Sequence, residues 1–355
     1  MSVRTRADLA ALPGYVPGRS IPGAIKLASN EVSLGPLPSV VAAIAQAATQ
    51  INRYPDNGAG ELVARLARKL EVADDQVAVG CGSVTLCQQL IQATCVAEDE
   101  VMFGWRSFEA YPILTHVVGA AQTRVPLTED HFLDLDAMLA AITPRTRLIY
   151  FCNPNNPTGT AHRRADVERF IEAVPSDVLI VIDEAYGEFV DDPEVPDGVD
   201  IAKEQWAAGR DNVAVLRTFS KAYGLAGLRV GYLVAPAVVV AAVSKVYVPF
   251  AVNAIAQVAA MASLDAEDEL LARCRDIVGE RGRVRAALTD MGFDVPETQA
   301  NFVWLPLGEQ TVAFNEHCLG QKVVVRAFAG EGARVTIGTP EENDVFLAAA
   351  GSFPR

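Results

Sequence analysis

Residues that commonly bind metals or form disulfides are scarce in this sequence. Its 355 residues include six cysteines and four histidines. No two cysteines have the Cys-x-x-Cys spacing, and the histidines show no spacing typical of metal ligands. Several cysteines lie in apolar runs, which favours buried free thiols over metal ligands or disulfides. We therefore expect no metal site and a reducing compartment, the cytoplasm.

The sequence also lacks an excess of basic residues and a secretion signal. The formal net charge is -14, so the surface would repel the phosphates of nucleic acids, and we expect no nucleic-acid partner. Residues 1–16 contain Arg4, Arg6 and Asp8 and no uninterrupted apolar core, which is not the pattern of a signal peptide.

One uncharged segment, Val246–Leu264, is nearly long enough to span a bilayer. It contains Pro249, which would break a helix at that point. We expect instead a buried helix from about Asn253 that leaves the large domain for the small one. No membrane partner is therefore predicted.

What the sequence does contain predicts an α/β protein. Half of the residues are hydrophobic, and the length is sufficient for two domains. Apolar strands alternate with helices such as residues 59–71 and 163–173, which is typical of a mostly parallel sheet flanked by helices. From about Asp265, long amphipathic helices precede short strands, which indicates a smaller α+β domain. We expect an arm at 1–28, a large domain at 29–250 and a small domain at 251–355 with which the arm packs.

A lone lysine, Lys221, lies among small and apolar residues in the segment Thr218–Gly231. An amine in low-dielectric surroundings loses its proton more readily, so it can attack a carbonyl and form a Schiff base. Thr218, Ser220 and Arg229 could bind a phosphate through hydroxyls and a planar guanidinium. Taken alone, the segment fits equally well a surface lysine in a glycine-rich loop.

Polar residues follow two apolar runs of strand length. Val178–Ile182 ends in Asp183, and a carboxylate at the carboxyl end of a buried parallel strand lies where such sheets bind ligands. This carboxylate could keep the ring nitrogen of a pyridine cofactor protonated, and Tyr186 could donate to the phenolic oxygen of the ring. The alternatives are a helix N-cap for Asp183 and simple packing for Tyr186. The second run, 148–152, leads into a rigid turn that offers Asn156 to the same pocket.

Residues 77–85 indicate a strand, a tight glycine turn and the start of a helix. Free backbone N–H groups and the helix dipole make this a candidate phosphate site. It is not a dinucleotide-binding fingerprint, because the third glycine of that pattern is missing.

These segments together resemble the pyridoxal-phosphate aminotransferases of fold type I, in the histidinol-phosphate aminotransferase branch. The resemblance covers nearly the whole chain, from Tyr15 to the region of Arg334. Its motifs occur in the order of the family, namely Ser29-Asn30-Glu31, Arg53-Tyr54-Pro55-Asp56, Gly80-Cys81-Gly82-Ser83, Asn155-Asn156-Pro157-Thr158-Gly159, Asp183-Glu184-Ala185-Tyr186, residues 220–229 and residues 334–338.

The resemblance implies a pyridoxal 5′-phosphate cofactor and a role for each matching residue. Lys221 would hold the cofactor as a Schiff base and move the proton between substrate and cofactor. Asp183 would pair with the pyridinium nitrogen, while Tyr186 and Asn156 would hold the phenolic oxygen. Phosphate ligands would be the backbone amides of Ser83 and Val84 and the side chains of Thr218, Ser220 and Arg229.

Two aromatic residues receive roles from the same resemblance. Phe108 matches the aromatic residue that stacks on the pyridine ring, although an ordinary core phenylalanine is the alternative. Tyr54 matches a tyrosine that reaches the phosphate of the neighbouring subunit. A monomer would then have an incomplete site, so we expect a homodimer.

The substrate contacts implied by the resemblance include two arginines near the carboxyl terminus. An arginine inside an apolar strand is costly unless it meets an anion. Arg334 matches the arginine that binds the substrate carboxylate, and Arg326 matches a second anion contact in the histidinol-phosphate enzymes. A structural ion pair is the alternative for both. Tyr15 matches an arm residue that closes over the substrate, and Asn30 lies in the first motif.

The amino acid substrate is narrowed by local departures from the histidinol-phosphate enzymes. Val32-Ser33 follows Asn30-Glu31 where those enzymes usually continue with Asn-Pro, and residues 105–112 look more like the aromatic (phenylalanine) aminotransferases. Tyr111, Trp105 and Phe250 could line an apolar pocket for an aromatic side chain. We therefore expect transfer from phenylalanine, tyrosine or tryptophan to 2-oxoglutarate with ping-pong kinetics.

Two other enzyme activities remain alternatives at this point, histidinol-phosphate transamination and decarboxylation on the same scaffold. The fate of the alpha carbon depends on which bond is held perpendicular to the ring, which sequence does not reveal. The small-molecule partners are in each case an amino acid and, for transamination, a 2-oxo acid.

Replacing Lys221 with alanine should abolish turnover, because no other residue of the motif offers an amine to a carbonyl. The measurement is steady-state transamination by the purified variant loaded with cofactor. Near-normal activity would contradict the assignment of Lys221.

Overall fold

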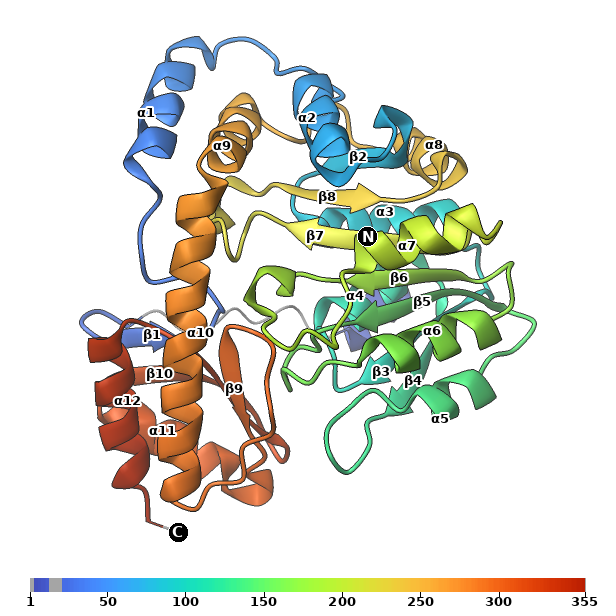
Figure 1. The fold of residues 1–355 in the computed structure, drawn as a ribbon. Helices are drawn as coiled ribbons and strands as arrows, with labels where there is room; N and C mark the ends of the chain where they lie inside the picture. Colours follow the sequence, from blue (N-terminus) through green and yellow to red (C-terminus); the bar gives the residue numbers. More distant parts are fainter. Residues whose placement is uncertain (1–2, 13–20, 355) are drawn as a thin grey trace.

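The computed structural model describes residues 3–12 and 21–354 and shows two sheets that lie side by side (Figure 1). The larger sheet has seven strands in the order β2-β8-β7-β6-β5-β3-β4. Strand β8 is antiparallel to both of its neighbours, and the other adjacent strands are parallel. The seven strands are β2 (Val77–Gly80), β3 (Glu100–Trp105), β4 (Ala121–Pro126), β5 (Thr146–Cys152), β6 (Leu179–Asp183), β7 (Val213–Thr218) and β8 (Gly231–Val234).

Helices cover both faces of this sheet because its central strands are apolar on both sides. Ile180 and Ile182 of β6 belong to one hydrophobic cluster, and Leu179 and Val181 belong to the other, as the two-residue period of a strand requires. The first cluster includes residues of α2 (Gly60–Leu70), α5 (Leu135–Ala140), α6 (Arg164–Ala173), α7 (Gly198–Ala207) and α9 (Ala254–Asp265). The second includes residues of α3 (Ser83–Thr94), α4 (Ala110–Val118) and α8 (Ala237–Lys245).

The smaller sheet has four strands and its own hydrophobic cluster. Its order is β1-β10-β11-β9, with β1 (Ile25–Leu27), β9 (Phe302–Leu305), β10 (Val323–Phe328) and β11 (Gly332–Thr336). The long helix α10 (Glu267–Asp290) runs from the large sheet to the small one, where α11 (Thr311–Gly320) and α12 (Pro340–Gly351) also pack (Figure 1). Helix α1 (Pro38–Ala47) packs on α9.

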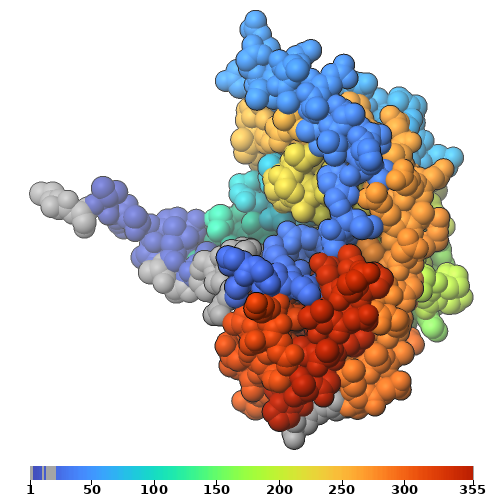
Figure 2. All heavy atoms as spheres, turned by 90° about the vertical axis from the view of Figure 1, so that its left-hand side faces the viewer, coloured from blue at the N-terminus to red at the C-terminus, as the bar shows by residue number. Residues whose placement is uncertain are grey.

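These observations confirm the predicted fold class, a mostly parallel sheet flanked by helices with a smaller α+β unit. Because β1 pairs in parallel with β10, the amino-terminal part of the chain does join the small sheet. Figure 2 shows that residues 3–12 (dark blue) protrude from one side of the molecule. Within this segment, Arg6 donates a hydrogen bond to the Val117 carbonyl oxygen at the end of α4 (2.8 Å).

The predicted buried helix at Asn253 is confirmed, but its predicted course is wrong. Helix α9 begins at Ala254, and the Asn253 side chain accepts a hydrogen bond from the Ala256 amide as its N-cap. Its alanines pack in the cluster of the large sheet, so α10 makes the passage to the small unit. The domain boundary at residues 250 and 251 stays a proposal.

Two further sequence features can be checked. All six cysteines are free thiols, and all except Cys81 are buried, as predicted. Among residues 3–12 and 21–354, no helix combines the length and the hydrophobicity needed to cross a membrane.

Strand β8 approaches the start of α3 so closely that only glycine fits at Gly231. A Cβ at this position would lie 2.6 Å from the Ser83 amide nitrogen and 3.0 Å from the Arg217 carbonyl oxygen. Both atoms belong to the backbone, which has little room to move.

We expect Gly231→Ala to lower the free energy of unfolding by roughly 1–3 kcal/mol, the usual cost of overpacking. The measurement is urea-induced unfolding. Gly279→Ala is the control, because Gly279 is exposed in α10 with nothing within 4 Å of its Cβ position. That change should stabilise the protein by up to about 1 kcal/mol through helix propensity. Equal unfolding midpoints for the two variants would contradict the close approach of β8 to α3.

Candidate active site

A cavity of about 490 Å³ lies between the carboxyl ends of the central strands of the large sheet and the β10–β11 hairpin. In this sheet β3 and β5 are neighbours, but the chain continues from β3 to β4 on one side and from β5 to β6 on the other. Open α/β sheets bind ligands at such a point, and the cavity lies there. Most of the predicted site residues line it, namely Asn30, Ser83, Val84, Phe108, Asn156, Asp183, Tyr186, Thr218, Ser220, Lys221, Arg229, Arg326 and Arg334.

Two predicted site residues are not among those that line the cavity. Tyr54 is 82% exposed and its ring stacks on that of Phe250, with centroids 4.6 Å apart. Tyr15 lies outside the described residues.

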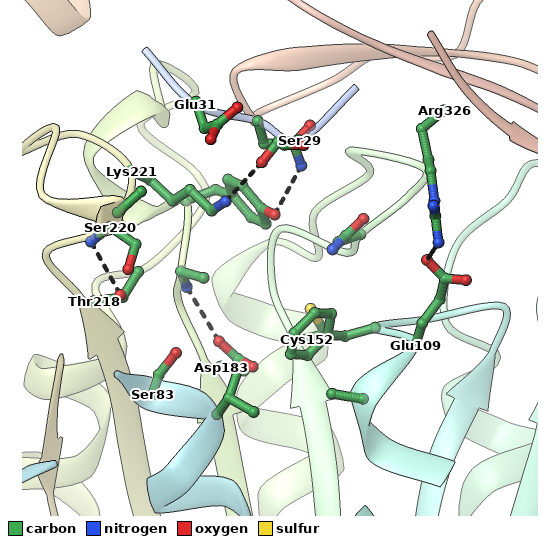
Figure 3. A pocket seen from close by; sticks show the side chains of 18 of the residues that line it. Ser29, Glu31, Ser83, Glu109, Cys152, Asp183, Thr218, Ser220, Lys221 and Arg326 are labelled. Atoms are coloured by element: carbon green, nitrogen blue, oxygen red, sulfur yellow. Dashed lines mark hydrogen bonds and ion pairs between the residues drawn. The ribbon is translucent and has the colours of Figure 1, made fainter. Parts of the chain in front are cut away.

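The Lys221 amine lies inside the cavity, above Asp183 in the view of Figure 3. Its Nζ donates a hydrogen bond to the carbonyl oxygen of Ser29 (2.9 Å). Burial lowers the pKa of Lys221 to about 7, and the positive charge of Arg334 contributes in the same direction. A large fraction of this amine is therefore unprotonated near neutral pH and can act as a nucleophile or base.

The carboxylate of Asp183 lies at the floor of the cavity, at the end of β6. Burial raises the pKa of Asp183, while a hydrogen bond from Tyr111 opposes this change. The Tyr111 hydroxyl donates to Oδ2 (2.6 Å), and the Ala185 amide donates to Oδ1 (3.2 Å). Both donors stabilise the ionised form and so oppose the effect of burial on the pKa of Asp183.

Tyr186 is oriented from the amino-terminal part of the chain. Asn30 donates from Nδ2 to the Tyr186 hydroxyl oxygen (2.8 Å), which leaves the phenolic hydrogen for another acceptor. The Thr336 hydroxyl donates to Oδ1 of Asn30 (3.0 Å), so the amide orientation is fixed. Asn30 thus acts here through Tyr186.

Arg334 joins the small sheet to the large one. Its Nη1 donates to Oδ1 of Asn156 (2.5 Å) and its Nη2 donates to the Ala28 carbonyl oxygen (2.7 Å). Because the Asn156 oxygen is taken up by Arg334, its NH₂ group is the end that faces other acceptors. Arg334 is buried, and its positive charge is suited to a carboxylate in the cavity.

An anion-binding cradle lies at the start of α3. The amides of Ser83 and Val84 open this helix, and Ser220 receives a hydrogen bond from Nη1 of Arg229 (3.3 Å). Gly82 has φ +75°, and a Cβ there would lie 2.4 Å from the Arg229 guanidinium. Glycine at this position therefore leaves the room that Arg229 needs beside the helix terminus.

Sequence reasoning missed one residue of this site, Glu109, and misplaced two others, Tyr111 and Trp105. Glu109 lines the cavity and forms an ion pair with Arg326. Tyr111 was predicted to line a substrate pocket, but it is fully buried beneath the cavity and contacts Asp183. Trp105 also lies apart from the residues that line the cavity, and its ring contacts the guanidiniums of Arg106 and Arg124.

The arrangement of a buried amine, a buried carboxylate and an anion cradle agrees with the comparisons to known proteins. Residues 22–349 match the family model "Aminotransferase class I and II", and the chain belongs to this family. An aromatic amino acid aminotransferase from Rhodococcus jostii (strain RHA1) is 59% identical over 352 residues, which are 99% of this chain and 96% of that protein.

Two other relatives support the same placement. An aromatic amino acid aminotransferase from Mycobacterium bovis (strain ATCC BAA-935 / AF2122/97) is 57% identical over 349 residues, which are 98% of this chain and 97% of that protein. The structure of histidinol-phosphate aminotransferase from Sinorhizobium meliloti in complex with pyridoxal-5′-phosphate superposes with a TM-score of 0.89 at 28% identity, covering 99% of this chain and 98% of that one. The family predicted from the sequence is thus confirmed.

We expect Tyr111→Phe to raise the pKa of Asp183, because the variant loses a donor to the ionised carboxylate. Less carboxylate is then present at neutral pH, so cofactor affinity should fall and recover only as the pH rises. The measurement is the dissociation constant of pyridoxal 5′-phosphate, followed by its absorbance between pH 5.5 and 8.5. A loss of about 10-fold at neutral pH corresponds to one charge-assisted hydrogen bond.

Tyr150→Phe is the matched control for this experiment. Tyr150 is equally buried, stacks on Tyr111 with centroids 4.4 Å apart, and donates to the Cys87 carbonyl oxygen instead of Asp183. Its loss should leave the pH dependence of cofactor binding unchanged. The same pH dependence in both variants would show that Tyr111 acts only through packing.

Proposed function

We propose that this protein is a pyridoxal-phosphate-dependent aminotransferase that transfers the amino group of aromatic amino acids to 2-oxoglutarate. The observation that carries this proposal is the presence of Lys221, Asp183 and Arg334 in one cavity. The names of the relatives at 57–59% identity support an aromatic substrate. Apolar side chains of Phe108, Ile113 and Leu114 on the cavity wall agree with such a substrate.

The residues of the cavity fit the proposed cofactor. The α3 amides, Thr218, Ser220 and Arg229 offer donors to its phosphate. Asp183 offers the anion that the protonated nitrogen of the pyridine ring needs. Asn156 and Tyr186 offer donors to the phenolic oxygen of the ring. When bound, pyridoxal 5′-phosphate supplies a carbonyl that accepts amino groups and a ring that withdraws electrons from the substrate carbon.

The protein groups then have distinct tasks in the reaction. Arg334 binds the carboxylate of the amino acid and thereby orients the substrate relative to Lys221. The Lys221 amine, with its pKa lowered to about 7, would move the proton between the alpha carbon of the substrate and the cofactor in each half of the reaction. Asp183 would offer its carboxylate from below, with hydrogen bonds from Tyr111 and the Ala185 amide stabilising the ionised form.

Histidinol phosphate is the second candidate substrate, since the solved structure from Sinorhizobium meliloti has this activity in its name. Arg326 lines the cavity and could meet a phosphate. The lower identity of this neighbour, 28%, favours the aromatic amino acids.

We also propose a homodimer in which Tyr54 completes the site of the neighbouring subunit. Tyr54 and Phe250, whose rings stack on each other, form an exposed aromatic patch. Such a patch favours contact with another protein surface. We propose a cytoplasmic location because the six cysteines remain free thiols.

The test is kcat/KM for phenylalanine, tyrosine and histidinol phosphate, each with 2-oxoglutarate and with purified, cofactor-loaded protein. We expect the two aromatic amino acids to exceed histidinol phosphate by at least about 10-fold, since the binding of a matched side chain is worth 1–3 kcal/mol. A preference for histidinol phosphate would reassign the substrate. Release of carbon dioxide without transfer to any acceptor would instead indicate a decarboxylase.

A further inference from the structure

Two arginines of the cavity are directly opposite each other on neighbouring strands. In the antiparallel pair β10–β11, Arg326 is the partner of Arg334, and both line the cavity. Like charges at such positions repel each other and destabilise a sheet. The structure therefore needs an anion near this pair.

Glu109 supplies that anion from the large sheet side. Its Oε2 accepts a hydrogen bond from Nη2 of Arg326 (2.6 Å), and Figure 3 shows the pair on the side of the cavity away from Ser220 and Thr218. Glu109 immediately precedes α4, next to Phe108. The side chains of Arg326 and Glu109 are 15% and 29% exposed, so the pair is sheltered but can be reached from the cavity.

The pair changes what the cavity can bind. Glu109 forms an ion pair with Arg326, and Arg334 offers its positive charge to the carboxylate of an aromatic amino acid. A 2-oxo acid with two carboxylates needs two cations. Arg326 is the second cation on the same wall of the cavity, but it already forms an ion pair with Glu109.

We infer that Glu109 is a specificity-determining residue that competes with substrate anions for Arg326. It holds Arg326 while an aromatic side chain fills the cavity, and it yields Arg326 to the second carboxylate of a dicarboxylic 2-oxo acid. This inference rests on the proposed function for the identity of the two substrates. It also explains how one cavity accepts both a neutral and an anionic side chain, since displacement of Glu109 occurs only for the latter.

A neighbouring ion pair provides a matched control. Arg106 and Glu331 also join the large sheet to the β10–β11 hairpin, and the Arg106 guanidinium lies 4.9 Å from the centre of the Phe328 ring. Neither Arg106 nor Glu331 is among the residues that line the cavity. Glu331→Gln therefore removes a carboxylate of the same kind from outside the cavity.

The experiment uses two unreactive probes that differ at one end, glutarate and 3-phenylpropanoate. Each offers one carboxylate to Arg334, and the other end is a carboxylate or a phenyl ring. Their dissociation constants are measured by isothermal titration calorimetry with cofactor-loaded wild type and with Glu109→Gln, Arg326→Gln, the double variant and Glu331→Gln. The informative quantity is the ratio of the two constants for each protein.

We expect Glu109→Gln to strengthen the binding of glutarate relative to that of 3-phenylpropanoate by about 5-fold, because a partly exposed competing carboxylate is removed. Arg326→Gln should weaken the binding of glutarate relative to that of 3-phenylpropanoate by about 10-fold or more. Adding Glu109→Gln to Arg326→Gln should have no further effect on the ratio, since the competition needs Arg326. Glu331→Gln should leave the ratio as in wild type.

An unchanged or inverted ratio in Glu109→Gln would overturn the inference, and so would an equal effect of Arg326→Gln on both probes. If Glu331→Gln changed the ratio as Glu109→Gln does, the effect would come from the loss of any negative charge near the cavity, and the inference would also fail. The proposed function fails on a different result, the absence of phenylalanine transamination by wild type. The probe ratio can be measured in either case, so the two failures are distinguishable.

Discussion

The cavity places two basic side chains, those of Lys221 and Arg334, close enough for the charge of Arg334 to lower the pKa of Lys221. Lys221 comes from the large sheet side and Arg334 from the small sheet, so the cavity exists only where the two sheets meet. Arg334 is fixed by hydrogen bonds to Asn156 and to the Ala28 carbonyl oxygen. Burial, and then the charge of Arg334, lower the pKa of Lys221 to about 7. Since Arg334 remains charged at any ordinary pH, Lys221 is the group of the two that gives up its proton.

A second set of charges lies behind the cavity and keeps the turn after β6 in place. Arg217 donates from Nε and Nη2 to one oxygen of Glu184 (2.9 and 2.8 Å), and the Gly198 amide donates to the other (2.6 Å). Burial raises the pKa of Glu184 to about 7 even with Arg217 beside it. This carboxylate directly follows Asp183, so its partners fix the backbone that aims Asp183 into the cavity.

The sequence could predict those parts of the site that depend on local pattern. Asp183 and Asn156 follow apolar runs, and parallel strands bring their carboxyl ends to one edge of the sheet. Glu109 and Tyr111 could not be assigned in this way. Their roles depend on how α4 packs over the sheet, which brings the Tyr111 hydroxyl to Asp183, and on a contact with Arg326 that is 217 positions away in the chain. Local sequence patterns could not predict the pairing of β1 with β10 either, because it joins residues as far apart as Ile25 and Val323.

That pairing has a consequence for the order in which the protein becomes competent during synthesis. Every strand of the large sheet has been made once Val234 is added, but Ile25 has to await Val323 as its partner in β10. The stretch between β1 and α1 includes Ser29, the acceptor for Lys221, and Asn30, the donor to Tyr186. Contacts this distant in the chain form late and cooperatively. A ribosome-bound chain can thus carry a folded large sheet and still lack an assembled cavity, so chemistry is withheld until β10 and β11 have been translated.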